Sequence, residues 1–348
     1  MATALTTNFT YTYPGILTTE LFFKPVIDDS PALGDFAIID PGISFRKIYN
    51  VVPNLDKILK PYVGCARTYN GTVAIGNVTL ETKEFEIGLE WCKDDFTQQL
   101  ASRYNNLAQE WLKTGINSFD PSGTPVARVI DQVIETGLRR DIARRIFFGD
   151  QDSSSADWNT INGVWPRLID TSGGSNYCVK RANGAGQTLA ALGTGSISDA
   201  NSLAALKAAW DQSSNLLKSN KSKLRFYVTG SVYDGYVSSL QSVSSGFTEL
   251  AYTALIDGVR TVTYNGIPVI PVRLWDEFLA DSTNPLYATT RHLVLLTMKE
   301  NHIIGVENTA DLNKVEGWYE RKDRKYYFEG NMKFGYQYLH CDLSTIVY

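Results

Sequence analysis

The sequence predicts an α+β fold, and three features carry that prediction. Between Thr82 and Trp91 apolar and charged residues alternate, which is typical of a half-buried strand. From Pro125 to Gly149 the apolar residues recur at helical spacing, and the stretch ends at a glycine. The last quarter opens with the hairpin dipeptide Asn265-Gly266 and continues through short apolar runs. The chain is therefore expected to contain both helices and strands.

The first half of the chain is expected to hold an extended β unit. Short strands are predicted at Phe36–Ile39 and Ile43–Phe45, around the turn Asp40-Pro-Gly42. In the alternating stretch the apolar face carries Phe85, Ile87, Leu89 and Trp91, and the opposite face carries Glu84, Glu86 and Glu90. A two-stranded arm of this kind needs a surface to rest on.

Two helices are predicted next. The first has Phe96, Leu100, Tyr104, Leu107 and Trp111 at helical spacing. The second runs from a cap at Thr124 for about 24 residues, or roughly 36 Å at 1.5 Å per residue. Its last turns carry Arg139, Arg140, Arg144 and Arg145, which either complement the helix dipole or contact a neighbouring subunit or DNA.

Glycine- and serine-rich turns fill residues 150–196, and neither GxxxxGK[ST] nor a strand-linked GxGxxG motif occurs there. Helices and strands then alternate from Ser198 to Val306, followed by a long terminal strand to Tyr348. The charged run Arg321–Lys325, which includes Arg324, precedes that strand. It is either a solvated turn or a contact to an acidic neighbour in an assembly.

Composition excludes several classes of protein. The 348-residue chain has a net charge of −4, which disfavours a dedicated nucleic-acid binder. No apolar run is long enough to span a membrane, and the first residues do not resemble a signal peptide. Four scattered cysteines and three histidines form no metal motif, and no catalytic constellation is present. We therefore expect no enzyme activity, no cofactor, no metal and no membrane partner.

Aromatic residues are numerous, with 19 Tyr, 15 Phe and 7 Trp, and many lie in expected surface strands. Because buried subunit interfaces are enriched in aromatic side chains, this count favours an assembly over a monomer.

The order of the last quarter is hairpin, Pro-bounded strand, buried strand, short strand and long terminal strand. It runs through Tyr264–Pro271, His292–Thr297, Asn301–Val306 and Lys333–Tyr348. This order resembles the major capsid proteins of tailed bacteriophages, which share the HK97-type fold. The resemblance implies an N-terminal arm at 1–33 and an extended β E-loop at 34–90. It also implies a peripheral (P) domain at 91–150 plus 306–348, with the 124–148 helix as its spine, and a mixed α/β axial (A) domain at 151–305.

The resemblance also implies a function. The chain would self-assemble into pentamers and hexamers of an icosahedral head shell that encloses double-stranded DNA. Assembly would take place in the host cytoplasm, and the chain would end in the virion. Expected partners are the chain itself, portal and scaffolding proteins, decoration proteins and packaged DNA contacted without sequence specificity. The residues expected at assembly interfaces are Phe36, Ile38, Phe85, Ile87, Leu89, Trp91, Arg144, Arg145, Arg321 and Arg324.

Two other interpretations stay open at this point. An encapsulin-type compartment shares this fold but would enclose a protein cargo. An α/β enzyme would use the glycine-rich 172–195 region to hold a small molecule.

Overall fold

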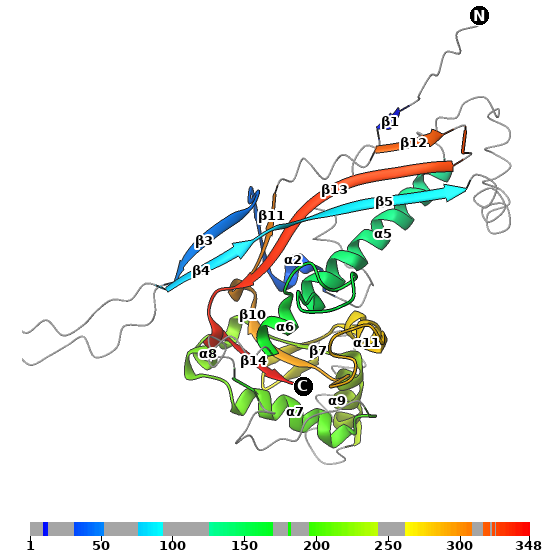
Figure 1. Ribbon diagram of the computed structural model, residues 1–348. Helices are drawn as coiled ribbons and strands as arrows, with labels where there is room; N and C mark the ends of the chain where they lie inside the picture. The colour runs from blue at the N-terminus through cyan, green and yellow to red at the C-terminus, as the bar shows by residue number, and fades with distance from the viewer. Residues whose placement is uncertain are drawn as a thin grey trace, which may run out of the picture.

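The computed structural model describes residues 10–12, 31–51, 76–92, 125–169, 180–181, 195–242, 262–307, 316–320, 322–323 and 325–348. Within these ranges the strands form two six-stranded sheets and a separate two-stranded hairpin. Figure 1 shows the first sheet and a long helix in the upper part of the molecule and the second sheet below them.

The first sheet is organised around β13 (Lys325–Tyr338), the longest described strand at 14 residues. Its antiparallel partner β5 (Lys83–Cys92) pairs with it over ten residues, from Lys83↔Phe334 to Cys92↔Lys325. The other strands are β1 (Thr10–Thr12), β12 (Glu316–Glu320), β11 (His302–Val306) and β2 (Ile38–Pro41), the last parallel to β11. The strand predicted at 82–91 thus lies beside the long strand predicted near the end of the sequence.

The long helix α5 (Pro125–Phe148) has 24 residues and runs along β5 and β13 (Figure 1). The short helices α2 (Leu33–Phe36) and α6 (Val164–Ile169) pack into the same core. At the end of α5, Ile142, Ile146 and Phe148 are buried, so this end of the apolar stripe predicted from the sequence faces the core.

The second sheet has the order β6 (Lys180–Arg181), β14 (Ser344–Val347), β10 (Val294–Met298), β7 (Leu224–Val228), β9 (Ile267–Pro271), β8 (Val262–Tyr264). Its helices are α7 (Asp199–Asp211), α8 (Asn215–Ser219), α9 (Gly230–Ser242) and α11 (Arg273–Ala280). The 3-10 turns are η2 (Lys221–Lys223), η3 (Lys299–Asn301) and η5 (Cys341–Leu343). All residues of β10, β11 and β14 are buried.

The two sheets share one hydrophobic core. The chain crosses from the second sheet to the first through η3 and returns through η5. Tyr227 and Leu295 of the second sheet belong to the same buried cluster as Ile304 and Phe334 of the first. The sheets are therefore parts of one packed body within the described chain.

A buried polar network lies at the junction of the two sheets. His302 Nδ1 lies 2.6 Å from the Tyr336 hydroxyl, and its Nε2 lies 2.8 Å from Thr297 Oγ1. Ser344 Oγ lies 3.1 Å from Thr297 Oγ1 and accepts a 3.0 Å hydrogen bond from Asn301 Nδ2. Burial lowers the pKa of His302 from 6.5 to about 3, so the ring is neutral at physiological pH.

The hairpin of β3 (Arg46–Val51) and β4 (Gly76–Glu81) leaves the body at the start of β5 (Figure 1). It rests on two glycines that face each other in the first sheet, Gly305 and Gly335. A Cβ added to Gly305 would lie 2.4 Å from the Leu80 side chain, and one added to Gly335 would lie 2.0 Å from the Glu81 carbonyl oxygen. The hairpin can therefore cross the sheet at this point only because neither glycine has a side chain.

Several expectations from the sequence are confirmed at the level of elements. The strand from 83 to 92 and the helix from 125 to 148 are present. The hairpin turn has positive φ at Asn265 (51°) and Gly266 (75°). Ser198 caps α7 by accepting a hydrogen bond from the Asn201 amide. The helix expected at 96–111 lies outside the described residues.

Three expectations are corrected. Phe36 lies in the helical turn Leu33–Phe36 rather than at the start of a strand, because Leu33 and Phe36 both pack into the core on that turn. Residues Ile43–Phe45 are not a strand, because Ile43 is buried beside Leu80 and Ile303 and β3 begins only at Arg46. The terminal segment is two strands rather than one, since β13 ends at Tyr338 and β14 belongs to the second sheet. In addition, α11 was not anticipated in the sequence.

The close contact between Gly335 and the hairpin gives a first prediction. Gly335→Ala should destabilise the fold by about 1–3 kcal/mol, because its Cβ meets backbone atoms that have no rotamer to escape into. Gly88→Ala in the neighbouring strand is the matched control, since nothing lies within 4 Å of its Cβ. Chemical denaturation of both variants measures the difference, and equal stabilities would contradict this account of the crossing.

The buried histidine gives a second prediction, on pH. The unfolded chain binds a proton at His302 below about pH 6.5, whereas the folded chain does not until about pH 3. Stability should therefore fall as the pH falls through this window, by about 2 kcal/mol between pH 7.5 and pH 5 from this residue. Denaturation of the native chain and of His302→Gln at both pH values isolates the contribution. A variant whose pH slope equals that of the native chain would show that His302 does not titrate in this way.

Candidate assembly surface

Four large apolar side chains are exposed on the first sheet and its hairpin. The exposed fractions are 40% for Ile38, 46% for Leu89, 54% for Ile48 and 71% for Phe45. Ile38 lies on β2, at one end of the described sheet order, and Ile48 lies on the projecting hairpin. Exposed apolar side chains on a projecting element are a feature of protein–protein contact surfaces.

The apolar face of β5 is divided between the core and the surface. The Phe85 ring stacks on Phe334 at a centroid distance of 4.2 Å, and Ile87 is buried. Leu89, further along the same face, is exposed. The alternation predicted from the sequence is thus confirmed. The first part of the apolar face packs on the core, and the part at Leu89 reaches the surface. The side chain of Trp91 lies outside the described residues, although its backbone pairs with Tyr326.

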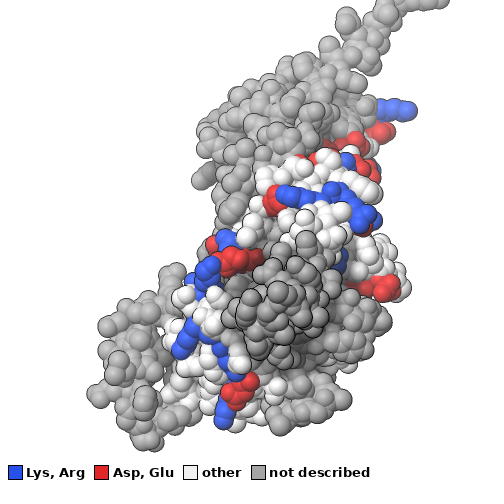
Figure 2. All heavy atoms as spheres, turned by 90° about the vertical axis from the view of Figure 1, so that its left-hand side faces the viewer, with Lys and Arg blue, Asp and Glu red and all other residues white. Residues whose placement is uncertain are grey.

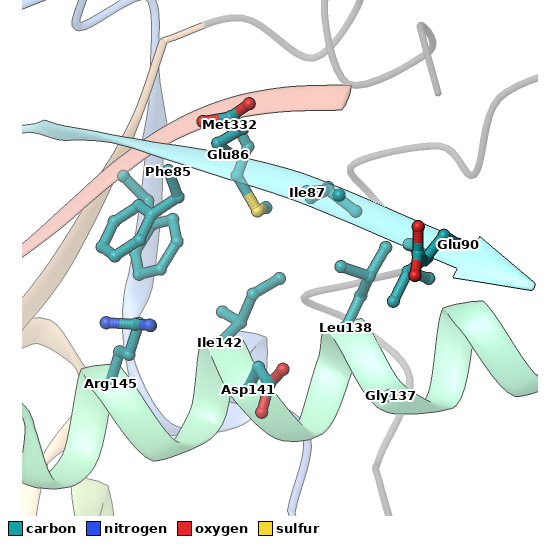
Figure 3. Close-up of a pocket in the computed structure, with 13 residues that line it drawn as sticks. Phe85, Glu86, Ile87, Glu90, Gly137, Leu138, Asp141, Ile142, Arg145 and Met332 are labelled. Atoms are coloured by element: carbon teal, nitrogen blue, oxygen red, sulfur yellow. The ribbon is translucent and has the colours of Figure 1, made fainter. Parts of the chain in front are cut away.

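A cavity of about 520 Å³ lies between β5, β13 and α5. Figure 3 shows Leu138 and Ile142 rising from α5 and Met332 coming down from β13 toward the same space. Phe85, Ile87, Leu89 and Phe334 add to this apolar lining, and Glu90, Asp141 and Arg145 also border the cavity. The described residues thus form an apolar groove with charged residues along its borders.

Arg145 links α5 to β5 and to the loop that follows the helix. Its guanidinium carbon lies 5.0 Å from the centre of the Phe85 ring, and its Nη1 donates a 2.8 Å hydrogen bond to Thr160 Oγ1 (Figure 3 shows the ring contact). Burial lowers the pKa of Arg145 below its usual value, and the nearby charges of Asp141 and Asp157 oppose that effect.

The other arginines at the end of α5 also have partners within the chain. Arg139 pairs with Glu135 at 3.0 Å and Arg140 with Glu277 at 2.7 Å. Arg144 pairs with Asp141 at 3.3 Å and lies over the rings of Trp158 and Phe278. The contacts of Arg140 with Glu277 and of Arg144 with Trp158 and Phe278 hold α5 against α11 and the 150–163 loop. A role for Arg144 and Arg145 in contacts between subunits stays a prediction.

Charge on one face of the molecule is mixed in sign. In Figure 2 the described Lys and Arg atoms lie close to Asp and Glu atoms, with uncharged surface between them. Elsewhere in the described chain, exposed cations pair with carboxylates in the same way, as in Lys223–Glu300 at 3.2 Å and Lys47–Asp40. This face therefore has no extended patch of one sign among its described residues, unlike a dedicated phosphate-binding surface.

The residues predicted from the sequence fall into three groups. Ile38 and Leu89 are exposed and available for contact, while Ile87 is in the core and Phe85 is half-buried. Phe36 is corrected as an interface residue, because its ring is fully buried between Phe147, Tyr227 and His302. Arg321 and Arg324 lie outside the described residues.

Sequence reasoning missed Phe45 and Ile48 as surface residues. Both flank the basic pair Arg46-Lys47, and apolar residues beside charges in a short β segment were a usable signal of a solvent-exposed strand. Among the described residues no group of His, Cys, Asp and Glu could hold a metal ion. No described helix is long and apolar enough to cross a membrane.

Comparison with known proteins was made by sequence and by structure. No protein-family model and no functionally curated protein matches the sequence. Solved structures do match. A chain from Mycobacterium phage Ogopogo aligns with a TM-score of 0.56 at 11% identity, over 95% of this chain and 99% of that one. A chain from the capsid of a native GTA particle aligns with a TM-score of 0.52 at 12% identity, over 96% and 92%.

A third structure, the satellite phage P4 procapsid including its size determination (Sid) protein, aligns with a TM-score of 0.52 at 12% identity, over 89% and 84% of the two chains. The chain has the fold of phage capsid proteins. At these identities the likeness concerns the fold, and it confirms the fold predicted from the sequence. The alignments cover 95% and 96% of this chain in the Ogopogo and GTA comparisons. The division into arm, E-loop, P-domain and A-domain stays a prediction.

The divided face of β5 gives a third prediction. Phe85→Ala should lower the free energy of unfolding by about 1.5–3 kcal/mol, because it removes the contacts with Phe334 and Arg145. Leu89→Ala should lower that free energy by less, about 0.5–1 kcal/mol, because nearly half of the residue is exposed. Denaturation measures stability, and light scattering measures association of both variants. If Leu89→Ala destabilised the subunit as much as Phe85→Ala, the division of this face would be wrong.

Proposed function

We propose that this chain is the major capsid protein of a tailed bacteriophage. It self-assembles into pentamers and hexamers that form an icosahedral shell around double-stranded DNA. The observation that carries the proposal is the capsid fold, which matches over nearly the full length of both chains in the Ogopogo comparison. The role is structural rather than catalytic, and the protein is a component of the virion.

The described surface supports association. Phe45 and Ile48 on the hairpin and Leu89 on β5 are exposed apolar side chains that a contact with another subunit would cover. Each contact between subunits can be weak, because closure of a shell makes many of them at once. Association through surfaces of this kind needs neither a cofactor nor a bound metal.

The expected partners follow from this role. The chain contacts further copies of itself, and a portal protein and scaffolding proteins take part in building the shell. Decoration proteins bind its outside, and packaged DNA is contacted without sequence specificity. No comparison favours the encapsulin or enzyme alternatives over the phage capsid.

Electron microscopy tests the proposal directly. The purified 38.7 kDa chain, alone and with scaffolding protein from the same source, should form rings or closed shells in negative stain. Shells formed in the infected host should contain DNA that resists added nuclease. Leu89→Asp should reduce shell yield at least severalfold, because it places a charge on a surface that assembly would dehydrate.

A control variant alters a charge outside the first sheet and its hairpin. Asp211→Asn changes an exposed charge at the end of α7 and should leave the yield of shells unchanged. A monomer under every condition, with and without scaffolding protein, would overturn the proposal. Shells filled with a protein cargo instead of DNA would replace it with the compartment alternative.

A further inference from the structure

The base of the β3–β4 hairpin is attached to the first sheet. Thr82 joins the two legs of the hairpin, because its amide donates a 3.0 Å hydrogen bond to the Phe45 carbonyl and its hydroxyl donates a 3.2 Å hydrogen bond to the Ile43 carbonyl. The Ile43 amide in turn donates a 3.0 Å hydrogen bond to the Val306 carbonyl in β11. Leu80 is fully buried beside Ile43 and Ile303 and packs over Gly305. Because β4 leads directly into β5, a hairpin held here alone could still tilt about its base.

A carboxylate on the body provides a further, polar attachment, beside the packing of Tyr49 against the cluster of Ile43, Leu80 and Ile303. Asp40 lies in β2, which is paired with β11 in the first sheet, so its backbone is fixed. Its Oδ2 accepts hydrogen bonds from Tyr49 Oη and Lys47 Nζ, both on β3. The Lys47 ammonium also lies 5.3 Å from the centre of the Tyr49 ring, so the three side chains form one cluster.

The strand register shows where this attachment acts. Lys47 is opposite Leu80 and Tyr49 is opposite Val78, so these four side chains share the face that lies against the body. Tyr49 is two residues further from the base than Lys47, or roughly 7 Å at strand spacing. The hydrogen bond between Asp40 and Tyr49 therefore lies further from the base of the hairpin than the buried Leu80 does. Ile48 lies on the opposite face, where it is exposed.

We infer that Asp40 is a positioning residue that sets the angle at which the β3–β4 hairpin projects from the body. With the base held at Thr82 and Leu80, the tie from Asp40 to Tyr49 removes the remaining tilt. The angle in turn sets the direction of the exposed face that carries Ile48. This second step rests on the proposed capsid function, because the direction of that face matters where another subunit must meet it.

The electrostatics agree with this geometry. Burial by itself would raise the pKa of Asp40, but the hydrogen bonds from Lys47 and Tyr49 lower it below its usual value overall. Burial and the nearby carboxylate raise the pKa of the Tyr49 hydroxyl, which keeps its proton for donation. Asp40 is therefore ionised and Tyr49 protonated at neutral pH, which is the pairing that gives a strong charge-assisted hydrogen bond.

Hydrogen exchange of the unassembled subunit at low concentration tests the inference. In Asp40→Ala, amides of β3 and β4 should exchange about tenfold faster, while those of β10 and β11 should keep their protection. Asp234→Ala is the matched control, because it breaks the exposed ion pair with Arg273 at 3.0 Å in the second sheet's helices. The control should leave exchange in the hairpin unchanged.

A combination of variants separates this tie from general damage. Lys47→Met with Tyr49→Phe should raise exchange in the hairpin as Asp40→Ala does, and adding Asp40→Ala to that pair should raise it little further. Asp40→Asn keeps an oxygen that accepts from Tyr49 and should give an intermediate rate, which also covers the case in which Asp40→Ala fails to fold. Unchanged protection of the hairpin in Asp40→Asn and in the Lys47–Tyr49 pair would overturn the inference.

Assembly is the second readout and is independent of the first. If the native chain forms shells, Asp40→Ala should give fewer closed shells and more irregular particles than Asp234→Ala at equal concentration. If Asp40→Ala exchanged faster but formed normal shells, Asp40 would still position the hairpin, but that position would not matter for assembly. If the native chain forms no shells, the proposed function fails, while the exchange result still decides whether Asp40 positions the hairpin.

Discussion

The shared core between the two sheets is the constraint on which the rest of the structure depends. β10 passes into β11 through one 3-10 turn, and β13 passes into β14 through another, so two short turns connect the sheets directly. Apolar side chains from both sides fill the space, and His302, Thr297, Tyr336 and Ser344 satisfy one another at the junction. A hinge between the sheets would expose these buried polar groups at a high cost in free energy. The described part of the molecule therefore acts as one rigid body, from which the hairpin projects.

The end of α5 shows how the same body supports its longest helix. Phe148 and Trp158 meet edge to face, and Trp275 and Phe278 of α11 lie against them. The arginines of the last turns then cover this aromatic cluster and pair with carboxylates around it. Packing and charge thus act at the same place, and the helix is fixed at its C-terminal end. Because α5 also packs against β5 and β13, its fixed end sets where these two strands lie relative to the core.

The sequence predicted the elements with strong local patterns. Alternation identified β5, the helical period identified α5, and Asn265-Gly266 located the β8–β9 turn. It did not predict the break at Tyr338, because residues on both sides of it favour strands and the choice of sheet is decided by tertiary packing.

The position of Phe36 was wrong for a related reason. An aromatic residue beside isoleucines favours a strand, but here the ring packs into the core from a helical turn. The helix α11 had a usable signal in Leu274, Trp275, Phe278 and Leu279, which all lie on one face. The contact surface was predicted only in part, because exposure depends on which face of each strand the body covers.

The position of β14 has a consequence for how the chain is made. This strand lies between β6 and β10, and its residues 344–347 leave the ribosome after every other described strand has been synthesised. Until then β10, whose side chains are all buried in the finished protein, has an unpaired edge on a nascent chain that is already more than 290 residues long. Completion of the second sheet therefore waits for the synthesis of β14, and until then the open edge of β10 is a place where another strand can pair wrongly. A chain interrupted before β14 would lack a strand inside this sheet, and the edge of β10 would stay open.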